Sequence, residues 1–342
     1  MAGAHTIETN REWGTKYMLS RHGFSGPWRA ILALASALFT APVCAQDTYP
    51  SRQITMIVPF AAGGTSDVIA RIIADRMGQI LGQRIVHENI AGAGGSTALT
   101  RLARAAPDGY TIGIGNSGTS AAVYWIHENI TFKADDFAPI GLVAKTAPMI
   151  ALRGDFPAST MVEFLDYLKK NPGKVTLGHA GTGSSNYLIC LNFMQAAKAD
   201  VQLVGYRGAA PAMNDLLSKT IDGVCDAATS LQSHVQGGTV KAMAVATDIR
   251  LKSLPLVPTS AEAGLADFSM QGWNGLFAPK GTPPALIARL NDVLRQALET
   301  EAVQKRFEEL ATTPVKLDER SPEALGKLVP IEIERYRKLL GK

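Results

Sequence analysis

The sequence is poor in the residues that build metal sites and nucleotide-binding loops, and each shortage argues against a class of function. Three cysteines and six histidines are scattered over 342 residues, and neither zinc-site spacings nor an HExxH motif occurs. No Gly-Lys-Ser/Thr follows a glycine turn, as a P-loop would require, and Ser117 lacks the GxSxG frame of a serine hydrolase. We therefore expect no metal ion, no cofactor and no catalytic residue.

Blocks of like charge are also missing. The chain carries 34 Lys and Arg residues against 30 Asp and Glu residues, a formal net charge of +4. Because these charges are dispersed, the sequence predicts neither a nucleic-acid partner nor a polybasic membrane patch. Beyond residue 45, no apolar run reaches the roughly 20 residues that a membrane-spanning helix needs.

The N-terminal region has the pattern of an export signal. Residues 30–43, AILALASALFTAPV, form an apolar run of signal-peptide length behind the basic flank of Arg21 and Arg29. Val43 and Ala45 suit the two recognised positions of a signal-peptidase site. We therefore expect the signal peptide, residues 1–45, to be cleaved after Ala45, and the mature protein to be periplasmic.

Three alternatives concern this same region. The apolar run could instead be a buried N-terminal helix, and Met18 could be the true start. Cys44 raises the question of a lipid anchor, against which the bulk of Val43 in front of it argues.

The mature chain of 297 residues (342 − 45) is long for one core and suits two domains. With four basic and two acidic residues removed, 30 and 28 remain, a net charge of +2. Two cysteines remain as well: Cys190 lies in a helical pattern and Cys225 in a strand-like run. We expect two buried free thiols, and a disulfide between them is the alternative in an oxidising compartment.

Short apolar runs alternate with helical patterns along the mature chain, which is typical of an α/β fold with mainly parallel sheets. Strands are expected at 53–58, 84–88, 110–115, 174–179, 201–206, 222–228 and 240–247, and helices before Gly82 and at 96–105, 185–197, 211–219, from Pro284 and at 321–340. Two long extended segments, 139–152 and 269–280, are expected to carry the chain into a second lobe and back. This predicts a first lobe from 46–146, a second from 147–271, and a return to the first over 272–342.

The segments expected at the carboxyl ends of the strands consist mainly of Gly, Ser, Thr and Ala. They are residues 63–66, 92–97, 116–120, 181–185, 207–210 and 227–230. Ligands of open α/β sheets bind outside these ends, where helix N-termini supply free N–H donors and partial positive charge. Several such corners at one cleft suit a ligand with more than one carboxylate. Ordinary helix capping is the alternative for each loop taken alone.

Individual side chains in these corners leave alternatives open. Arg207 could pair with a carboxylate in bidentate fashion or could be a surface arginine. Asp67 is expected to cap or brace its helix rather than to touch ligand, and Asp226 could meet a polar partner across the hinge. Phe60 and Trp273 could form a wall of the site or belong to the core.

One motif points to a different class of protein. Residues 113–118, GIGNSG, match GxGxxG after a strand, with Asp135 and Asp136 about twenty residues further on, which is the dinucleotide-binding fingerprint. The match lies in the third strand unit, and the segment after it, AAVYWIHEN, is short and aromatic. A nicotinamide-dependent oxidoreductase is therefore the alternative function and not the preferred one.

Several longer stretches, in order along nearly the whole mature chain, resemble the Bug-type extracytoplasmic solute receptors of tripartite tricarboxylate transporters. They are PFAAGGTSDVIARIIADRM, AGAGGSTALTRLARAAPDGYTI, GTGSSNYL, GYRGAAPAMNDLLSKTIDGVCD and GLFAPKGTPPALIARLN. The resemblance implies a two-lobed type II periplasmic binding protein and a non-enzymatic receptor. Departures from the family pattern lie in ENIAGAGG and at Gly205, and Asn186-Tyr187 could favour a larger or aromatic acid.

The small-residue loops and the resemblance together predict a set of ligand-binding residues. These are Phe60, Gly63, Gly64, Thr65, Ser66, Asp67, Asn116, Ser117, Gly118, Thr119, Ala180, Thr182, Gly183, Ser184, Ser185, Tyr206, Arg207 and Asp226. We predict that the protein captures a small organic carboxylate, with two or three carboxyl groups, and delivers it as a monomer to the membrane permease of such a transporter. A periplasmic sensor partner of the same fold is a further alternative.

Overall fold

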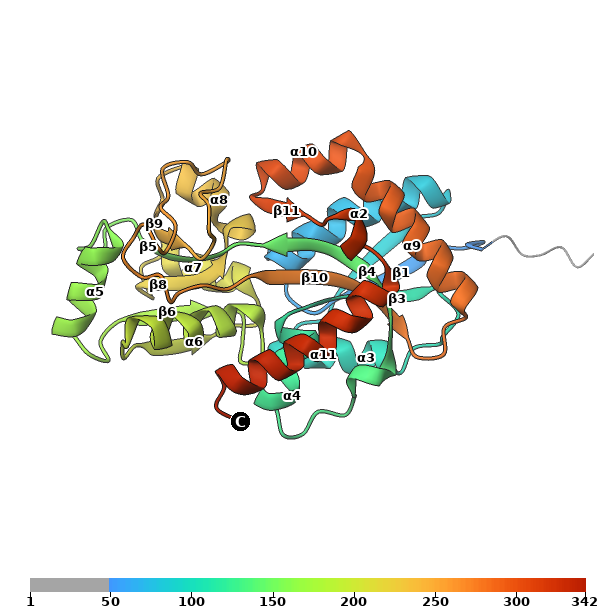
Figure 1. The fold of residues 1–342 in the computed structure, drawn as a ribbon, viewed down its shortest axis with the longest axis horizontal. Coiled ribbons are helices and arrows are strands. Elements are labelled where there is room, and N and C mark those ends of the chain that lie inside the picture. The colour runs from blue at the N-terminus through green and yellow to red at the C-terminus, as the bar shows by residue number, and fades with distance from the viewer. Residues whose placement is uncertain (1–48) are drawn as a thin grey trace, which may run out of the picture. The chain divides into compact units, whose positions relative to one another are not determined.

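The computed structural model describes residues 49–342, and its strands form two sheets (Figure 1). The six-stranded sheet has the order β11-β4-β10-β3-β1-β2. It contains β1 (Ile54–Val58), β2 (Ile85–Asn89), β3 (Thr111–Asn116), β4 (Phe137–Thr146), β10 (Gly272–Pro279) and β11 (Thr312–Pro314). The five-stranded sheet has the order β7-β6-β8-β5-β9 and contains β5 (Pro148–Arg153), β6 (Thr176–His179), β7 (Gln202–Gly205), β8 (Gly223–Ala227) and β9 (Val240–Val245).

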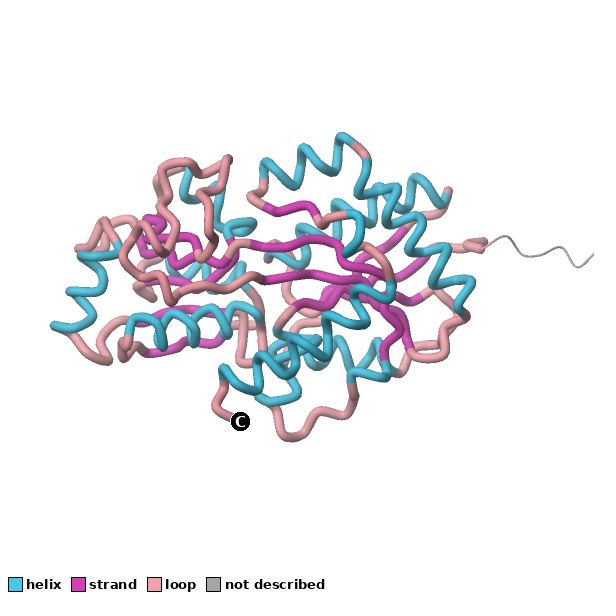
Figure 2. The backbone as a smooth tube through the Cα atoms, in the orientation of Figure 1, coloured by secondary structure: helices cyan, strands magenta, loops and turns pink. Residues whose placement is uncertain are grey.

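Helices flank both sheets (Figure 2). We call the six-stranded sheet with its helices lobe 1; it carries α2 (Thr65–Leu81), η1 (Ala93–Gly95), α3 (Ser96–Ala103), η2 (Gly118–Ala122), α4 (Val123–Ile126), η3 (Ala134–Asp136), α9 (Pro284–Glu299), α10 (Glu301–Glu309), η4 (Leu317–Glu319) and α11 (Pro322–Leu339). Lobe 2 is the five-stranded sheet with α5 (Met161–Lys170), α6 (Ser185–Ala197), α7 (Ala209–Leu217) and α8 (Ala228–Gln236). The α/β fold of two helix-flanked sheets is confirmed.

The expectation of mainly parallel sheets is wrong in one respect, because both sheets are mixed. Strands joined by helical crossovers do pair in parallel: β1 with β2 and β3, and β6 with β7 and β8. The strands that carry the chain between lobes run the other way. β10 is antiparallel to β3 and β4, and β5 is antiparallel to β8 and β9.

The crossing strands explain how the chain makes two lobes. β4 ends at Thr146 in one sheet, and β5 begins at Pro148 in the other. The return is made by β10, which pairs with β4 over its whole length. The exact lobe boundaries at residues 146 and 271 stay a prediction.

Periodic apolar residues bury each helix against its sheet, as α2 illustrates. Ile69, Ile73 and Met77 recur every four residues and are all fully buried. The helix ends at Gly82, whose φ of 69° is in the left-handed region that glycine adopts without steric cost. Because α2 is held along its length, its first turn stands in a fixed place after β1.

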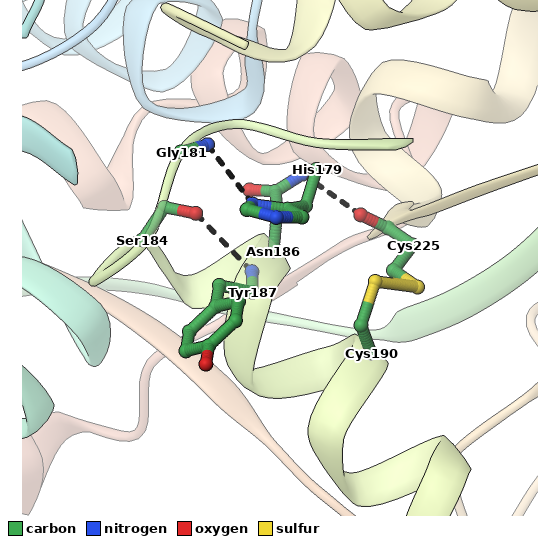
Figure 3. Close-up of a disulfide and its surroundings, with 7 residues drawn as sticks. All are labelled: His179, Gly181, Ser184, Asn186, Tyr187, Cys190 and Cys225. Carbon is green, nitrogen blue, oxygen red and sulfur yellow. Dashed lines mark hydrogen bonds between the residues drawn. A yellow bond between two sulfur atoms is a disulfide. The ribbon is translucent and has the colours of Figure 1, made fainter. Parts of the chain in front are cut away.

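Cys190 and Cys225 form a disulfide, which corrects the expectation of free thiols. Cys190 of α6 and Cys225 of β8 have their Cα atoms 5.4 Å apart, a separation that a disulfide spans (Figure 3). The helical and strand-like patterns around them were identified correctly. Their pairing depends on how α6 packs on the sheet, which sequence spacing does not show.

The expected signal peptide, its cleavage site after Ala45 and Cys44 all lie outside the described residues. Within residues 49–342, no helix combines the length and the hydropathy that crossing a bilayer requires.

Candidate ligand-binding site

A small cavity lies where the loops of both lobes meet, and its volume is about 20 Å³. Its wall consists of Phe60, Gly64, Thr65, Ser66, Asn116, Ser117, Thr146, Pro148, Ala180, Ser185, Asn186, Ile189, Ala209, Ala227, Met270, Gly272 and Asn274. None of these wall residues, all of them in the described part of the chain, carries a charged side chain. The charge of any bound ligand must therefore be balanced by backbone and side-chain dipoles.

On the lobe 1 side, a chain of side-chain hydrogen bonds fixes three wall residues. Asn116 Nδ2 donates to Ser66 Oγ at 3.2 Å, and Ser66 Oγ donates to Asn274 Oδ1 at 2.9 Å. Asn116 Oδ1 in turn accepts hydrogen bonds from the backbone N–H groups of Gly118 and Thr119, both at 3.0 Å. These bonds lock the turn after β3 and leave Gly118 and Thr119 outside the wall.

Asp67 braces the first loop instead of facing the cavity. Its carboxylate accepts from Gly63 N at 2.9 Å, from Asn89 Nδ2 at 2.9 Å, and from Arg71 through two nitrogens. Burial alone would raise the pKa of Asp67, but the hydrogen bonds from Arg71, Gly63 and Asn89 outweigh it and hold that pKa below its usual range. The expectation that Asp67 braces its helix agrees with these contacts, and Gly63 takes part in the same bracing.

Two hydroxyl groups of the wall are buried without a hydrogen-bond partner among the described residues: Thr65 Oγ1 and Ser117 Oγ. Ser117 is fully buried. Its hydroxyl lowers the pKa of the neighbouring Tyr336 phenol, although neither hydroxyl has a hydrogen bond of ordinary geometry. Burial is the main cause that raises the Tyr336 pKa. Thr65 Oγ1 is thus a wall hydroxyl with its bonding capacity still available to a ligand.

On the lobe 2 side, local bonds hold the loop between β6 and α6 (Figure 3). Ser184 caps α6, since its Oγ accepts from Tyr187 N at 3.1 Å, and the Nδ1 of His179 accepts from Gly181 N at 3.1 Å. Burial lowers the pKa of His179 to about 4, so the ring is neutral at pH 7. Asn186 Nδ2 donates to Cys225 O at 3.1 Å, next to the disulfide.

Asp226 and Tyr206 do not belong to the cavity wall. Asp226 is completely buried at the end of β8, where its Oδ1 accepts from Ala227 N at 2.7 Å. Burial raises the pKa of Asp226 to about 6 despite that bond. The hydroxyl of Tyr206 donates to Asp215 Oδ2 at 2.7 Å, and burial, followed by this acidic partner, raises the Tyr206 pKa to about 12.

Arg207, the one cation expected in the site, does not line the cavity. Its side chain is exposed, while its backbone oxygen accepts a hydrogen bond from Ala61 N of lobe 1 at 3.3 Å. The residue therefore joins the two lobes through its main chain. Its guanidinium lies outside the wall.

Four helices begin at the cavity. α2 begins at Thr65, α6 at Ser185 and α7 at Ala209, while α8 begins directly after Ala227, and all four residues line the wall. The first turn of a helix has N–H groups without intrahelical partners and a partial positive charge. Because α2 belongs to lobe 1 and the other three to lobe 2, both sides of the cavity suit an anionic group.

The lobes are in contact around this cavity. His127 Nε2 lies 2.9 Å from Thr182 O, which joins the turn after α4 to the β6–α6 loop. A Cβ placed on Gly118 would lie 2.3 Å from Ser185 N, so the two backbones approach as closely as a glycine permits. A cavity of about 20 Å³ holds roughly one water molecule. An organic acid therefore needs the lobes to move apart before it can enter.

The glycines of the GIGNSG motif have a packing role. A Cβ on Gly113 would lie 2.6 Å from Leu102 Cδ2, and one on Gly115 would lie 2.1 Å from Ser120 Oγ. Both glycines are inside β3 and give room to neighbouring side chains. These packing contacts account for the glycines at positions 113 and 115, and no bound dinucleotide is needed to explain them.

Of the predicted ligand-binding residues, the structure brings eight to the cavity wall: Phe60, Gly64, Thr65, Ser66, Asn116, Ser117, Ala180 and Ser185. Ten others lie beside it or face elsewhere: Gly63, Asp67, Gly118, Thr119, Thr182, Gly183, Ser184, Tyr206, Arg207 and Asp226. Nine wall residues are outside the predicted set: Thr146, Pro148, Asn186, Ile189, Ala209, Ala227, Met270, Gly272 and Asn274. That any of them binds ligand stays a prediction.

Comparison with known proteins places this geometry in context. The family model described as "Tripartite tricarboxylate transporter family receptor" matches residues 69–341. The "UPF0065 protein in the TAR-I ttuE-ttuC' intergenic region" of Agrobacterium vitis is 39% identical over 301 residues, which cover 87% of this chain and 86% of that protein.

Two solved structures are similar over most of the chain. MatC from Rhodopseudomonas palustris with bound malate has a TM-score of 0.82 at 36% identity and covers 85% of this chain and 99% of its own. The periplasmic binding protein BugD has a TM-score of 0.82 at 38% identity, with coverage of 86% and 98%.

Proposed function

This chain belongs to the tripartite tricarboxylate transporter receptor family, and on that premise we propose that its interlobe cavity captures a small organic acid with two or three carboxylates. The receptor delivers this acid to the membrane permease of such a transporter. It acts by binding alone, without chemical conversion of the ligand. The malate bound by MatC supports a ligand of this class.

The observation that carries the proposal is the convergence of four helix N-termini on a wall without charged side chains. Backbone N–H groups and neutral hydroxyls such as that of Thr65 bond a carboxylate at low desolvation cost to the protein, since no buried ion pair has to be broken. Positive ends in both lobes suit an acid with a carboxylate at each end.

Ligand binding then drives closure. A ligand that contacts both lobes binds the closed arrangement more tightly than the open one and shifts the population toward closure. The contacts from Ala61 to Arg207 and from His127 to Thr182 form in the closed arrangement, in which wall side chains such as Ile189 and Met270 must move aside, because a cavity of about 20 Å³ is too small for the acid. The permease would thereby receive a receptor whose surface reports that the site is filled.

A thermal-shift screen tests the function on protein that has been unfolded and refolded to remove any carried ligand. Malate, succinate, adipate and citrate are compared with acetate and with oxidised and reduced nicotinamide dinucleotides. A ligand at a hundredfold excess over its Kd stabilises the folded state by about 2.7 kcal/mol. With roughly 2–4 °C per kcal/mol, a matching acid raises the Tm by about 5 °C or more.

The dinucleotides and acetate are expected to leave the Tm unchanged. A shift with a dinucleotide and none with any di- or tricarboxylate would overturn the receptor assignment. We also propose export with cleavage after Ala45 and a monomeric mature protein. The intact mass of the secreted chain and its elution in size-exclusion chromatography test these two points.

A further inference from the structure

Asp226 is a buried carboxyl group next to the interlobe cavity, and the proposed function leaves it without a role. Its side chain belongs to a residue that is 3% exposed, and it follows Cys225, whose backbone oxygen accepts a hydrogen bond from Asn186 Nδ2 (Figure 3). Asn186 and Ala227, the residue after Asp226, both line the cavity. The carboxyl group therefore lies directly behind the wall without being part of it.

The carboxyl group of Asp226 is bonded to the start of α8. Its Oδ1 accepts from the N–H of Ala227 at 2.7 Å, and the N–H of Ala228, the first residue of α8, donates to Ala147 O at 2.8 Å. Both N–H groups therefore have acceptors already. What remains for a ligand at this helix start is the partial positive charge of the N-terminus, about half an elementary charge. An ionised carboxylate at this place cancels that charge, whereas a protonated carboxyl group leaves it available to an anion.

Within residues 49–342, no charged side chain compensates Asp226. The titratable side chains of the elements packed against β8 and α8 are Arg153 of β5, His179 of β6, Tyr187 of α6, Asp215 of α7, His234 of α8, and Asp67 with its partner Arg71 of α2. Burial raises the pKa of Asp226 to about 6, and the donors Ser230, Ala227 and Asn186 lower it only in part, with no contribution from any charge. His179 is neutral at this pH, because burial lowers its pKa to about 4.

A bound dicarboxylate would bring a second negative charge to the same helix start. A ligand carboxylate in contact with Ala227 lies near the range of roughly 4–6 Å in which like charges raise one another's pKa. The pKa of Asp226 is then higher in the complex than in the free receptor, so binding takes up protons from solvent when the pH is above the free value. Affinity therefore rises as the pH falls and levels off below the free value of about 6.

We propose that Asp226 is a proton-binding group of the receptor, which captures its acid together with a proton and holds the acid less tightly once that proton is lost. The inference rests on the proposed function and adds that a side chain behind the wall sets the charge which the site accepts. Asp226 is a positioning residue in this role, since it acts through the start of α8 and does not touch the ligand.

The test measures affinity by calorimetry between pH 6 and pH 8, with whichever of malate, succinate and adipate raises the Tm most in the thermal-shift screen. The wild type is expected to bind this acid at least fivefold more tightly at pH 6 than at pH 8. Titrations at pH 7 in two buffers of different ionisation enthalpy should show a net uptake of protons on binding.

Two variants assign the proton. Asp226→Asn keeps an oxygen for Ala227 N and is uncharged at every pH, so its affinity should change less than twofold over this range and should exceed that of the wild type at pH 8 at least fivefold. This variant also corrects for the titration of the ligand itself. Asp215→Asn removes another carboxyl group of lobe 2, one that bonds Tyr206 outside the wall, and as the matched control it keeps the pH dependence of the wild type.

Infrared spectroscopy follows the proton without relying on affinity. The difference between wild type and Asp226→Asn reports the protonated carboxyl group of Asp226, which should titrate near 6 in the free receptor and at a higher pH when the acid is bound. A carboxylate that stays ionised at pH 5 would overturn the proposal even if affinity varied with pH.

The affinity measurements separate this inference from the function on which it rests. Binding of equal strength at pH 6 and pH 8 in the wild type would overturn the inference and leave the receptor function standing. So would equal pH dependence in the wild type and Asp226→Asn, because another titratable group, such as His127 between the lobes, would then be responsible. No binding of any of the three acids at any pH would overturn the proposed function and this inference with it.

Discussion

The two halves of the wall of the interlobe cavity are held in place by different kinds of interaction. In lobe 1, the wall depends on side-chain hydrogen bonds through Ser66, with Asn116 and Asn274 as its partners. In lobe 2, the disulfide between Cys190 and Cys225 ties α6 to β8, the two elements that present Asn186 and Ala227 to the cavity. One half is fixed by weak directional bonds and the other by a covalent link.

The carboxyl groups next to the two halves also titrate in opposite directions. The lowered pKa of Asp67 means that its contribution to stability is present above the pKa of the unfolded chain and is lost as pH falls through the folded value. The pKa of Asp226, raised to about 6, means the reverse: the native state holds this proton more tightly, so stability falls as pH rises toward 6. The ionised carboxyl group of Asp67 thus stabilises the folded state of lobe 1, whereas the protonated carboxyl group of Asp226 stabilises that of lobe 2.

The largest effect is expected when the disulfide of lobe 2 is removed. With the cysteines 35 positions apart in the sequence, Cys190→Ala/Cys225→Ala should lower the free energy of unfolding by about 3–4 kcal/mol, since the unfolded chain regains the entropy of an open loop. The Tm should fall by roughly 10 °C. Reductant should lower the Tm of the wild type and leave the variant unchanged. Equal Tm values for the two proteins would show that lobe 2 does not depend on the disulfide.

The next prediction tests whether the two lobes must come into contact for the ligand to bind tightly. In Gly118→Ala, the added Cβ would lie 2.3 Å from Ser185 N and 2.6 Å from Gly183 O, which are backbone atoms of the other lobe. Closure is blocked while lobe 1 itself tolerates alanine in a helical turn. Affinity for the matching acid should fall at least a hundredfold, about 2.7 kcal/mol. Calorimetry measures this loss, small-angle scattering should show a larger radius of gyration, and unchanged affinity would contradict the required contact.

A smaller effect is expected when a charge is added to the lobe 1 half of the cavity wall. Asn274→Asp keeps the acceptor for Ser66 Oγ and the size of the side chain, but places a negative charge in a wall that has none. Binding of a dicarboxylate should weaken about tenfold, or 1.4 kcal/mol, through repulsion. Asn274→Ala, which adds no charge, serves as the control and should weaken binding less. A larger loss in the alanine variant would indicate that the hydrogen bond matters more than the charge.

The smallest effect concerns the opposite titrations. Asp226→Asn retains an oxygen for Ala227 N but removes a buried charge, so the Tm at pH 7.5 should rise by about 2 °C. At pH 5 the difference should shrink, since the wild-type carboxyl is then mostly protonated. Thermal melts between pH 4 and pH 8 measure this, and parallel curves for the two proteins would mean that Asp226 does not titrate near 6.

Much of the fold followed from local signals in the sequence. The helix expected at 185–197 was found at those residues, because Ser184 caps it and Gly-Thr-Gly precedes it. α5 was missed although Thr160 and Glu163 form a cap at its start, a signal that the sequence does contain. The sequence signal for α10 is weaker, because Val303 and Phe307 are its buried residues and most of the others are charged or polar.

The cavity wall was predicted in part, because ligand contacts were sought in loops between a strand and its helix; that its residues bind ligand stays a prediction. That rule found Thr65, Ser66 and Ser185. It missed Thr146, Pro148, Gly272 and Asn274, which come from the strands that cross between lobes and reach the cavity through long-range pairing. Asn274, a polar residue in an otherwise apolar strand, was the available hint. It also placed Arg207 in the site, although only tertiary packing decides where a long side chain points.

The absence of charged side chains from the wall bears on how receptors of this kind diversify. Every residue except proline has a backbone N–H, so mutations at Thr65, Ser185 or Ala209 change side chains while the donors at the helix starts persist. If the proposed site is correct, substitutions at Ile189 and Met270 would alter the space between two carboxylates without removing the N–H groups proposed to hold them. A lineage built on this scaffold can therefore explore new acids by gradual drift, and directed evolution can start from these two positions.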